Sequence, residues 1–214
     1  MRKEQKERLH EDDRFVKTVS AAWDKVLERR TMVLTTLAVV SVVFITVAVF
    51  AGLREVQSRR ALDALAAAET IEEMEAASES YPRAAELLLR LARQYHERGE
   101  EGDLERAQQT LERAAKAADT DLLRGLTDFA LGKVKKDRGH HEQALEHLDA
   151  ALRNHRTRPI VGNEATFLAG RCLELLGRHE EASERYITLR EERQSVWQQL
   201  AEYRLTKLRQ DGLM

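Results

Sequence analysis

The sequence predicts an all-α protein: one transmembrane helix followed by helix-turn-helix repeats. Two observations predict it. Residues 31–53 contain no charged side chain, although 34% of the residues in the chain are charged. After residue 81, a pattern of small, turn and large residues recurs three times. Only two prolines and ten glycines occur among 214 residues, which favours helix almost throughout.

The apolar stretch at 31–53 predicts a membrane-spanning helix. Thirteen of its 23 residues are Val, Leu, Ile or Phe, and their summed insertion free energy is roughly −4 to −8 kcal/mol. As a helix it would be about 34 Å long, enough for a hydrocarbon core of about 30 Å. A cleaved signal peptide usually has a shorter apolar core and a shorter leader. A buried core helix would need other apolar segments around it, and the rest of the chain supplies none.

The basic residues that flank this stretch predict its orientation. Five Lys and Arg residues lie in the twenty residues before it, and three, Arg54, Arg59 and Arg60, lie in the twenty after it. Lys and Arg are retained on the cytoplasmic side of a membrane. We therefore expect a cytoplasmic amino terminus and a carboxy-terminal region outside the cytoplasm.

Four regions follow. Residues 1–30 are expected to be a cytoplasmic tail with a short amphipathic helix from Phe15 onward, because apolar residues recur there at helical spacing. Residues 31–53 are the transmembrane helix, 54–80 are linking helices, and 81–214 are the repeat domain with a terminal capping helix.

Local signals place the helix ends. Thr70 and Glu73 form a predicted capping box before a short helix that ends at Ser80. A second box, Ser195 and Gln198, begins the last helix. One side of that helix is expected to carry Val196, Trp197, Leu200, Ala201, Leu205 and Leu208. Residues 156–163, with Pro159 and Gly162, are expected to be a loop between units.

The three repeats align on the glycine of the turn between two helices. Seven residues before each turn glycine stands a small residue, and after the turn an alanine is followed four residues later by a larger apolar residue. These positions are the turn glycines Gly99, Gly139 and Gly177, the small residues Ala92, Gly132 and Gly170, the alanines Ala107, Ala144 and Ala182, and the large residues Leu111, Leu148 and Tyr186. Small residues of this kind let two antiparallel helices approach closely.

This pattern resembles the tetratricopeptide repeat, a helix-turn-helix unit of 34 residues. The layout of tail, single anchor and degenerate repeats is similar to that of the ancillary subunit family of the bacterial SecYEG translocon. The resemblance implies a bacterial inner-membrane protein with a periplasmic repeat domain. Its partners would be translocon subunits, periplasmic chaperones or other envelope proteins.

No enzyme motif is found, and no cofactor or metal site is expected. Cys172 reads as a buried structural thiol, and His140, His141 and His147 lack the companion ligands of a tetrahedral metal site. A net charge of −2 does not favour nucleic acid as a partner. We therefore expect a non-enzymatic protein-interaction module that assists translocation, chaperoning or assembly.

Two other functions stay open. The cytoplasmic tail could bind a cytosolic factor, which would make the protein a regulatory anchor. The chain could also form a homo-oligomeric scaffold, and Ala48 and Gly52 supply one small-xxx-small pair in the anchor.

A peptide groove is expected on the first helices of the repeats. One equivalent position carries a cation in each repeat, and the position one turn earlier carries an apolar residue. The six residues are Leu89 with Arg93, Phe129 with Lys133, and Phe167 with Arg171. A cation beside an apolar anchor suits a peptide with acidic groups or a free carboxylate. The alternative is that the cations are solvated and the apolar residues pack between helices.

Overall fold

The computed structural model describes residues 30–190 and 195–213, without the side chains of Arg30 and Val33. Within these residues the protein is all-helical, with nine helices and no strand. The chain divides into two compact units after Val56. The predicted cytoplasmic tail lies outside the described residues.

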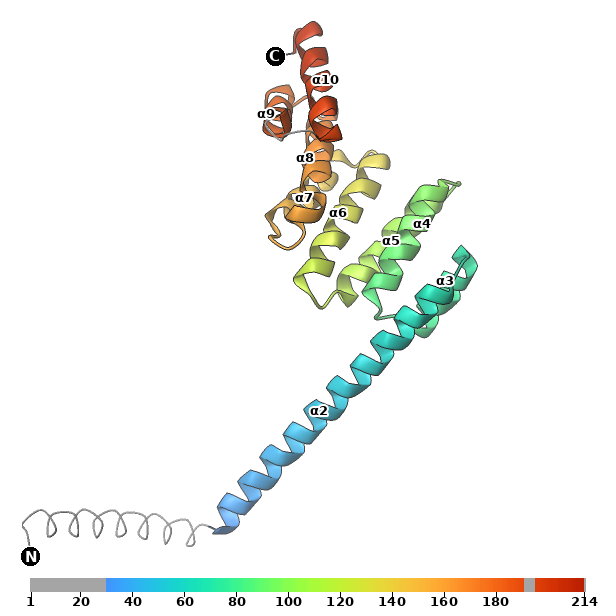
Figure 1. Ribbon diagram of the computed structural model, residues 1–214, viewed down its shortest axis with the longest axis vertical. Helices are drawn as coiled ribbons and strands as arrows, with labels where there is room; N and C mark the ends of the chain where they lie inside the picture. The colour runs from blue at the N-terminus through green and yellow to red at the C-terminus, as the bar shows by residue number, and fades with distance from the viewer. Residues whose placement is uncertain (1–29, 191–194, 214) are drawn as a thin grey trace, which may run out of the picture. The chain divides into compact units, whose positions relative to one another are not determined.

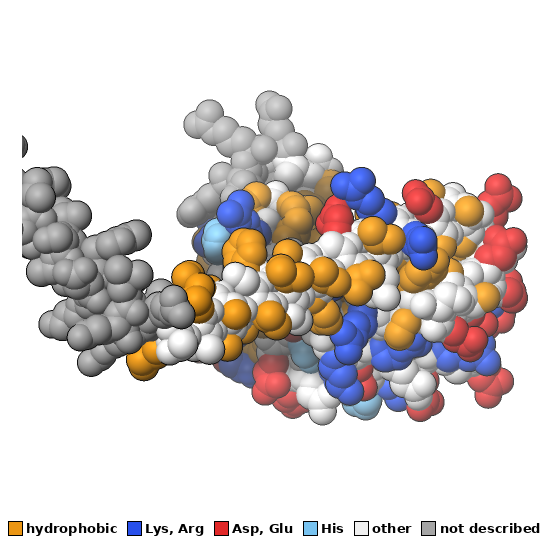
Figure 2. All heavy atoms as spheres, turned by 90° about the horizontal axis from the view of Figure 1, so that it is seen from below, with side chains coloured by type: hydrophobic (Ala, Val, Ile, Leu, Met, Phe, Trp, Pro, Cys, Tyr) orange, Lys and Arg blue, Asp and Glu red, His pale blue; other side chains and the backbone are white. Residues whose placement is uncertain are grey.

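Helix α2 (Arg30–Ala67) contains the apolar stretch. From Leu34 onward it is long and apolar enough to cross a membrane. The large apolar side chains between Leu34 and Leu53 are exposed, from 54% for Phe50 to 74% for Phe44, and Figure 2 shows hydrophobic side chains gathered along this helix. Within the described residues, this stretch is not buried as the core helix of a soluble domain would be.

The threonines in this apolar stretch bond within the helix. Thr36 donates to the carbonyl of Met32 (2.8 Å), and Thr46 donates to that of Val42 (2.7 Å). A hydroxyl satisfied in this way needs no partner outside the helix, which lowers the cost of placing it in an apolar medium.

Eight further helices follow in the second unit. They are α3 (Ile71–Ser80), α4 (Ala85–Arg98), α5 (Asp103–Ala117), α6 (Asp121–Asp137), α7 (His141–Arg153), α8 (Arg158–Leu175), α9 (His179–Arg190) and α10 (Val196–Gln210). From α3 onward, each helix packs against the next in the chain, and α4, α6, α8 and α10 also contact one another in that order. Figure 1 shows these helices side by side in chain order, from green α4 to red α10.

The turn glycines lie where the alignment predicts them. Gly99, Gly139 and Gly177 end α4, α6 and α8 with φ of 67°, 80° and 73°. This left-handed conformation strains any residue with a Cβ, so glycine is the residue that ends a helix sharply and starts the next one antiparallel to it.

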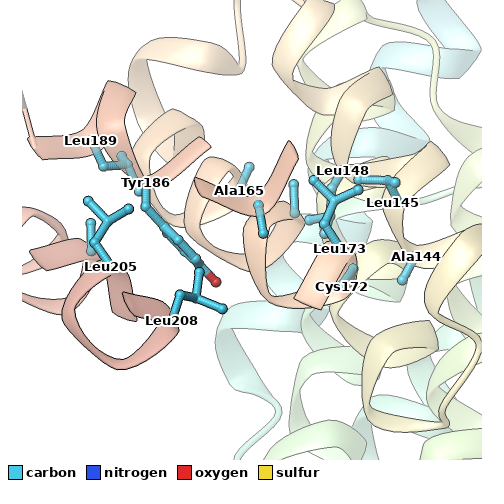
Figure 3. Close-up of a cluster of buried hydrophobic side chains, with 13 residues drawn as sticks. Ala144, Leu145, Leu148, Ala165, Cys172, Leu173, Tyr186, Leu189, Leu205 and Leu208 are labelled. Carbon is cyan, nitrogen blue, oxygen red and sulfur yellow. The ribbon is translucent and has the colours of Figure 1, made fainter. Parts of the chain in front are cut away.

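Small and large residues of the same pair meet across the two helices. A Cβ built on Gly132 would lie 2.7 Å from Leu148 Cγ, and one on Gly170 would lie 2.7 Å from Tyr186 Cε1. Both distances are too short for a carbon contact, so the predicted close approach is confirmed in two pairs. Tyr186 belongs to the core cluster of Figure 3, where its ring extends toward Leu208 of α10.

Both predicted helix starts are confirmed, the first with a complete capping box and the second with a side-chain cap. Thr70 accepts from the backbone N–H of Glu73, and the Glu73 carboxylate accepts from the N–H of Thr70, which completes the capping box. Hydrogen bonds from the backbone N–H groups of Glu69 and Thr70 lower the pKa of the Glu73 carboxyl. The side chain of Ser195 accepts from the N–H of Gln198 and caps α10.

Two expectations about local structure are wrong. Residues 158–163 are not a loop but the first turns of α8, because a proline in the first turn removes an N–H that has no partner within the helix anyway. Val196 and Leu200 do not share the buried side of α10; they face outward, with exposed fractions of 59% and 37%.

Candidate functional site

The six predicted groove residues lie on the three consecutive helices α4, α6 and α8 in one register. In each helix the cation directly follows the buried small residue, as Lys133 follows Gly132 and Arg171 follows Gly170. Because α4 packs on α6 and α6 on α8, equivalent positions form a row across the helices. We refer to these six residues as the first-helix row.

The apolar members of the row are partly buried and pack within the fold. Leu89 packs against the cluster that contains Leu91. Phe129 and Phe167 pack against the second cluster. The ring of Phe167 contacts two other rings, with its centroid 5.7 Å from that of Tyr186 and 5.6 Å from that of Trp197. Helix α10 therefore contacts the last apolar member of the row through Trp197.

The cation of the middle repeat stacks on its apolar neighbour. Lys133 Nζ lies 5.3 Å from the centre of the Phe129 ring, within the range of a cation–π contact. It also donates to Glu164 on α8 at 2.8 Å, which links α6 to α8. Lys133 is thus held in place by an aromatic face and a carboxylate.

The outer two cations of the row also have acidic partners. Arg93 bonds Glu97 one turn later on α4 at 2.6 Å, and its side chain is 75% exposed. This hydrogen bond, more than any other contact, raises the pKa of Arg93, and the charge of Glu164 adds to it. Arg171 bonds Glu174 at 2.6 Å and is more buried. Each cation of the row is therefore paired with a carboxylate.

A buried carboxylate, Glu174, ties α8 to α10. Its side chain is only 7% exposed, and it accepts from both Arg171 and Arg204. Burial lowers the pKa of Arg204, and the like charge of Arg171 adds to this. Arg204 was not among the predicted site residues, although the sequence carries a signal for it: Arg204 stands at an inward position of an amphipathic helix, between Ala201 and Leu205.

Two histidine–aspartate pairs connect helices near the row. His96 at the end of α4 contacts Asp137 at the end of α6 (Nε2 to Oδ2, 2.7 Å), and His147 of α7 contacts Asp128 of α6 (2.9 Å). The contact with His96 is the main reason that the pKa of Asp137 falls to about 2. His147 is therefore bonded to a carboxylate rather than simply solvated.

The described residues hold no group of three or more side chains that could bind a metal ion. Cys172 is fully buried in α8, and burial raises the pKa of its thiol to about 11. A thiol in this state is a poor nucleophile at neutral pH, so its surroundings are those of a core residue.

No protein-family model matches the chain, and no curated protein sequence matches it. The role of the first-helix row therefore depends on its own geometry and chemistry.

Proposed function

We propose that this protein is a membrane-anchored, non-enzymatic interaction module whose second unit is a tetratricopeptide-like α-solenoid that holds other polypeptides. The observation that carries the proposal is the first-helix row: apolar and charged side chains in one register on α4, α6 and α8. A row of this kind offers a partner repeated anchor points along a fixed surface.

The anchor is α2, and the amino terminus is cytoplasmic in this proposal. The exposure and apolar character of α2 support a membrane span, and the charge bias around it supports the orientation. The likeness of the layout to the ancillary SecYEG subunit supports a periplasmic setting in a bacterial inner membrane. There the module would assist translocation, chaperoning or assembly of envelope proteins.

The ion pairs indicate how a partner would bind. A partner carboxylate that reaches Arg93 competes with Glu97 in an exposed pair, which contributes at most about 1 kcal/mol. At Arg171 it would have to displace the buried Glu174, which costs several times more. The carboxylate partner of Lys133, Glu164, is 30% exposed, so its displacement costs less than that of Glu174. Arg93 and Lys133 are therefore the cations that a partner would engage, and Arg171 mainly supports the fold.

Site-specific photo-crosslinking in native membranes tests the proposal. A photoreactive residue at position 93, 133 or 171 should capture a polypeptide, most strongly at 93 and 133. The matched controls are the exposed, equivalent positions of the second helices, Gln109, Glu146 and Glu184. If both sets captured the same proteins equally, the first-helix row would have no binding role.

Charge reversal gives an independent check. Arg93→Glu with Lys133→Glu should abolish capture of the polypeptide found by crosslinking, because each substitution replaces an attraction with a repulsion. Lys116→Glu with Lys207→Glu makes the same change in net charge at two exposed positions away from the row and should leave capture intact.

A further inference from the structure

The connection between α7 and α8 is basic and contains no acidic residue. We use the name basic loop for residues 153–160, which comprise the last residue of α7, the connection itself and the first turn of α8; they include Arg153, His155, Arg156 and Arg158. No Asp or Glu occurs between Asp149 and Glu164, the longest stretch without an acid after residue 55. The chain as a whole has a net charge of −2, so this concentration of positive charge is local.

The charged side chains of the basic loop are available. Arg153, Arg156 and Arg158 are all exposed, and none of them forms an ion pair with another residue in the described part of the chain. The row cations all have a carboxylate partner, so the basic loop differs from them. Beside these arginines, Ile160 exposes 62% of its surface.

The backbone of the basic loop is held in one conformation. Asn154 Oδ1 accepts from the N–H groups of Arg156 (3.0 Å) and Thr157 (3.3 Å), and its amide donates to the carbonyl of Asp121 (2.6 Å). Thr157 is fully buried against α6. A Cβ on Gly125 would lie 1.9 Å from Thr157 Oγ1, so this glycine makes room for the loop. The arginines therefore project from a fixed base.

We propose that the basic loop docks on an anionic phospholipid surface, with its guanidinium groups on lipid phosphates and Ile160 in the headgroup layer. The inference extends the proposed function, since it assumes that α2 keeps the chain at a membrane. Guanidinium groups bind phosphate through two parallel hydrogen bonds. Because the anchor tethers the second unit to the membrane, the effective concentration of lipid headgroups available to the basic loop is high.

Lipid is favoured over an acidic polypeptide by the exposed isoleucine. A membrane surface satisfies cations and an adjacent apolar side chain together, in the manner of other interfacial segments. Pairing with carboxylates alone would leave Ile160 in water. Removing three arginines should weaken docking on an anionic surface by about 100-fold at physiological salt.

A label at residue 160 tests the inference in the full chain. Ile160→Cys is labelled with an environment-sensitive fluorophore; the native Cys172 is buried and its thiol pKa is raised, so it should stay unlabelled. The protein is placed with vesicles of phosphatidylcholine alone, or with 30% phosphatidylglycerol. With the anionic lipid we expect brighter emission and protection from an aqueous quencher. Both should vanish in high salt.

Matched triple variants separate this loop from net charge. Arg153→Ala, Arg156→Ala and Arg158→Ala together should abolish the response. Lys116→Ala, Lys207→Ala and Arg209→Ala together remove the same charge from exposed positions elsewhere and should keep it. Gly125→Ala should also weaken the response, because it displaces the loop without removing a charge.

The remaining outcomes are decisive as well. A label that responds equally in both lipids, or equally to soluble polyglutamate, would overturn the inference. Flotation of the chain with pure phosphatidylcholine vesicles reports on the anchor alone. If flotation fails, the proposed membrane anchor is wrong, while the response of the label to anionic vesicles still decides the role of the basic loop.

Discussion

The ring of Tyr186 on α9 lies directly over Gly170 on α8, with no space for a methyl group between them. Gly170→Ala should therefore destabilise the protein by about 1–2 kcal/mol: overpacking costs about 1–3 kcal/mol, and the better helix propensity of alanine offsets part of it. Chemical unfolding followed by circular dichroism would measure the change.

Gly162, in the same helix, supplies the control. A Cβ there would meet only the flexible stem of Arg158, at 3.3 Å. Gly162→Ala should stabilise the protein by up to about 1 kcal/mol. If both alanines shifted stability in the same direction, the contact between Gly170 and Tyr186 would not be the tight one described.

Removing Arg204 should loosen the last helix. Arg204→Ala leaves the buried Glu174 with Arg171 alone, and we expect a loss of about 2–4 kcal/mol. Protection of α10 amides from hydrogen exchange should fall first. Arg209 is exposed on the same helix. Arg209→Ala should therefore change the free energy of unfolding by less than about 0.5 kcal/mol.

A double-mutant cycle isolates that ion pair. Glu174→Gln with Arg204→Ala should cost clearly less than the sum of the two single changes, since the second change removes a charge that the first has already left unpaired. Additive costs would mean that the two side chains do not interact.

Acid should weaken the contact between α4 and α6. Asp137 has a pKa of about 2 in the folded protein, below its ordinary value of 3.8. A lowered folded pKa adds stability that is present above about pH 4 and is lost as the pH falls toward 2. Because Asp137 is partly solvated, we expect this contribution to be below about 1 kcal/mol.

The variant Asp137→Asn tests the assignment. It should be less stable than the natural protein at pH 6, and the difference should disappear by about pH 2. The free energy of unfolding in urea, measured across this range, checks it. If the difference in free energy of unfolding between the two proteins did not change with pH, the loss of stability in Asp137→Asn would come from packing and not from the charge of Asp137.

The capping box at the start of α3 should contribute locally. Thr70→Ala removes the acceptor for the N–H of Glu73 and should cost about 1 kcal/mol, while Thr70→Ser should be close to neutral. Hydrogen exchange at the amides of residues 71–74 would show whether the loss is confined to the first turn of α3.

The features that depend on local sequence were predictable. The positive φ at Gly139, the capping box at Thr70 and the close approach at Gly132 each follow from residue type and spacing. The start of α8 could not be predicted in this way. Pro159 and Gly162 are typical of a loop, and here they lie in the first turns of a helix, where they are tolerated.

The chemistry of the candidate site was less predictable than its position. The alignment placed Lys133 and Phe129 one turn apart, and the structure brings them into contact. The carboxylate partners come from another helix, as Glu164 does, or from a neighbouring turn, as Glu174 does. The pairs of Arg93 with Glu97 and of Arg171 with Glu174 have the i,i+4 and i,i+3 spacing of helix neighbours. The pairing of Lys133 with Glu164 depends instead on how α6 packs against α8, which spacing within one helix does not report.

The two hydrogen bonds that Arg204 of α10 donates to Glu174 limit how such a chain can evolve. The residues equivalent to Glu174, three before each turn glycine, are His96 in α4 and Lys136 in α6. Neither side chain could neutralise Arg204. The terminal helix α10 therefore fits against α8, whereas if it packed against α6 in the same way, Arg204 would be repelled by Lys136. Duplicating an internal helix pair at this end would therefore create a stack whose last helix has no acid to receive it.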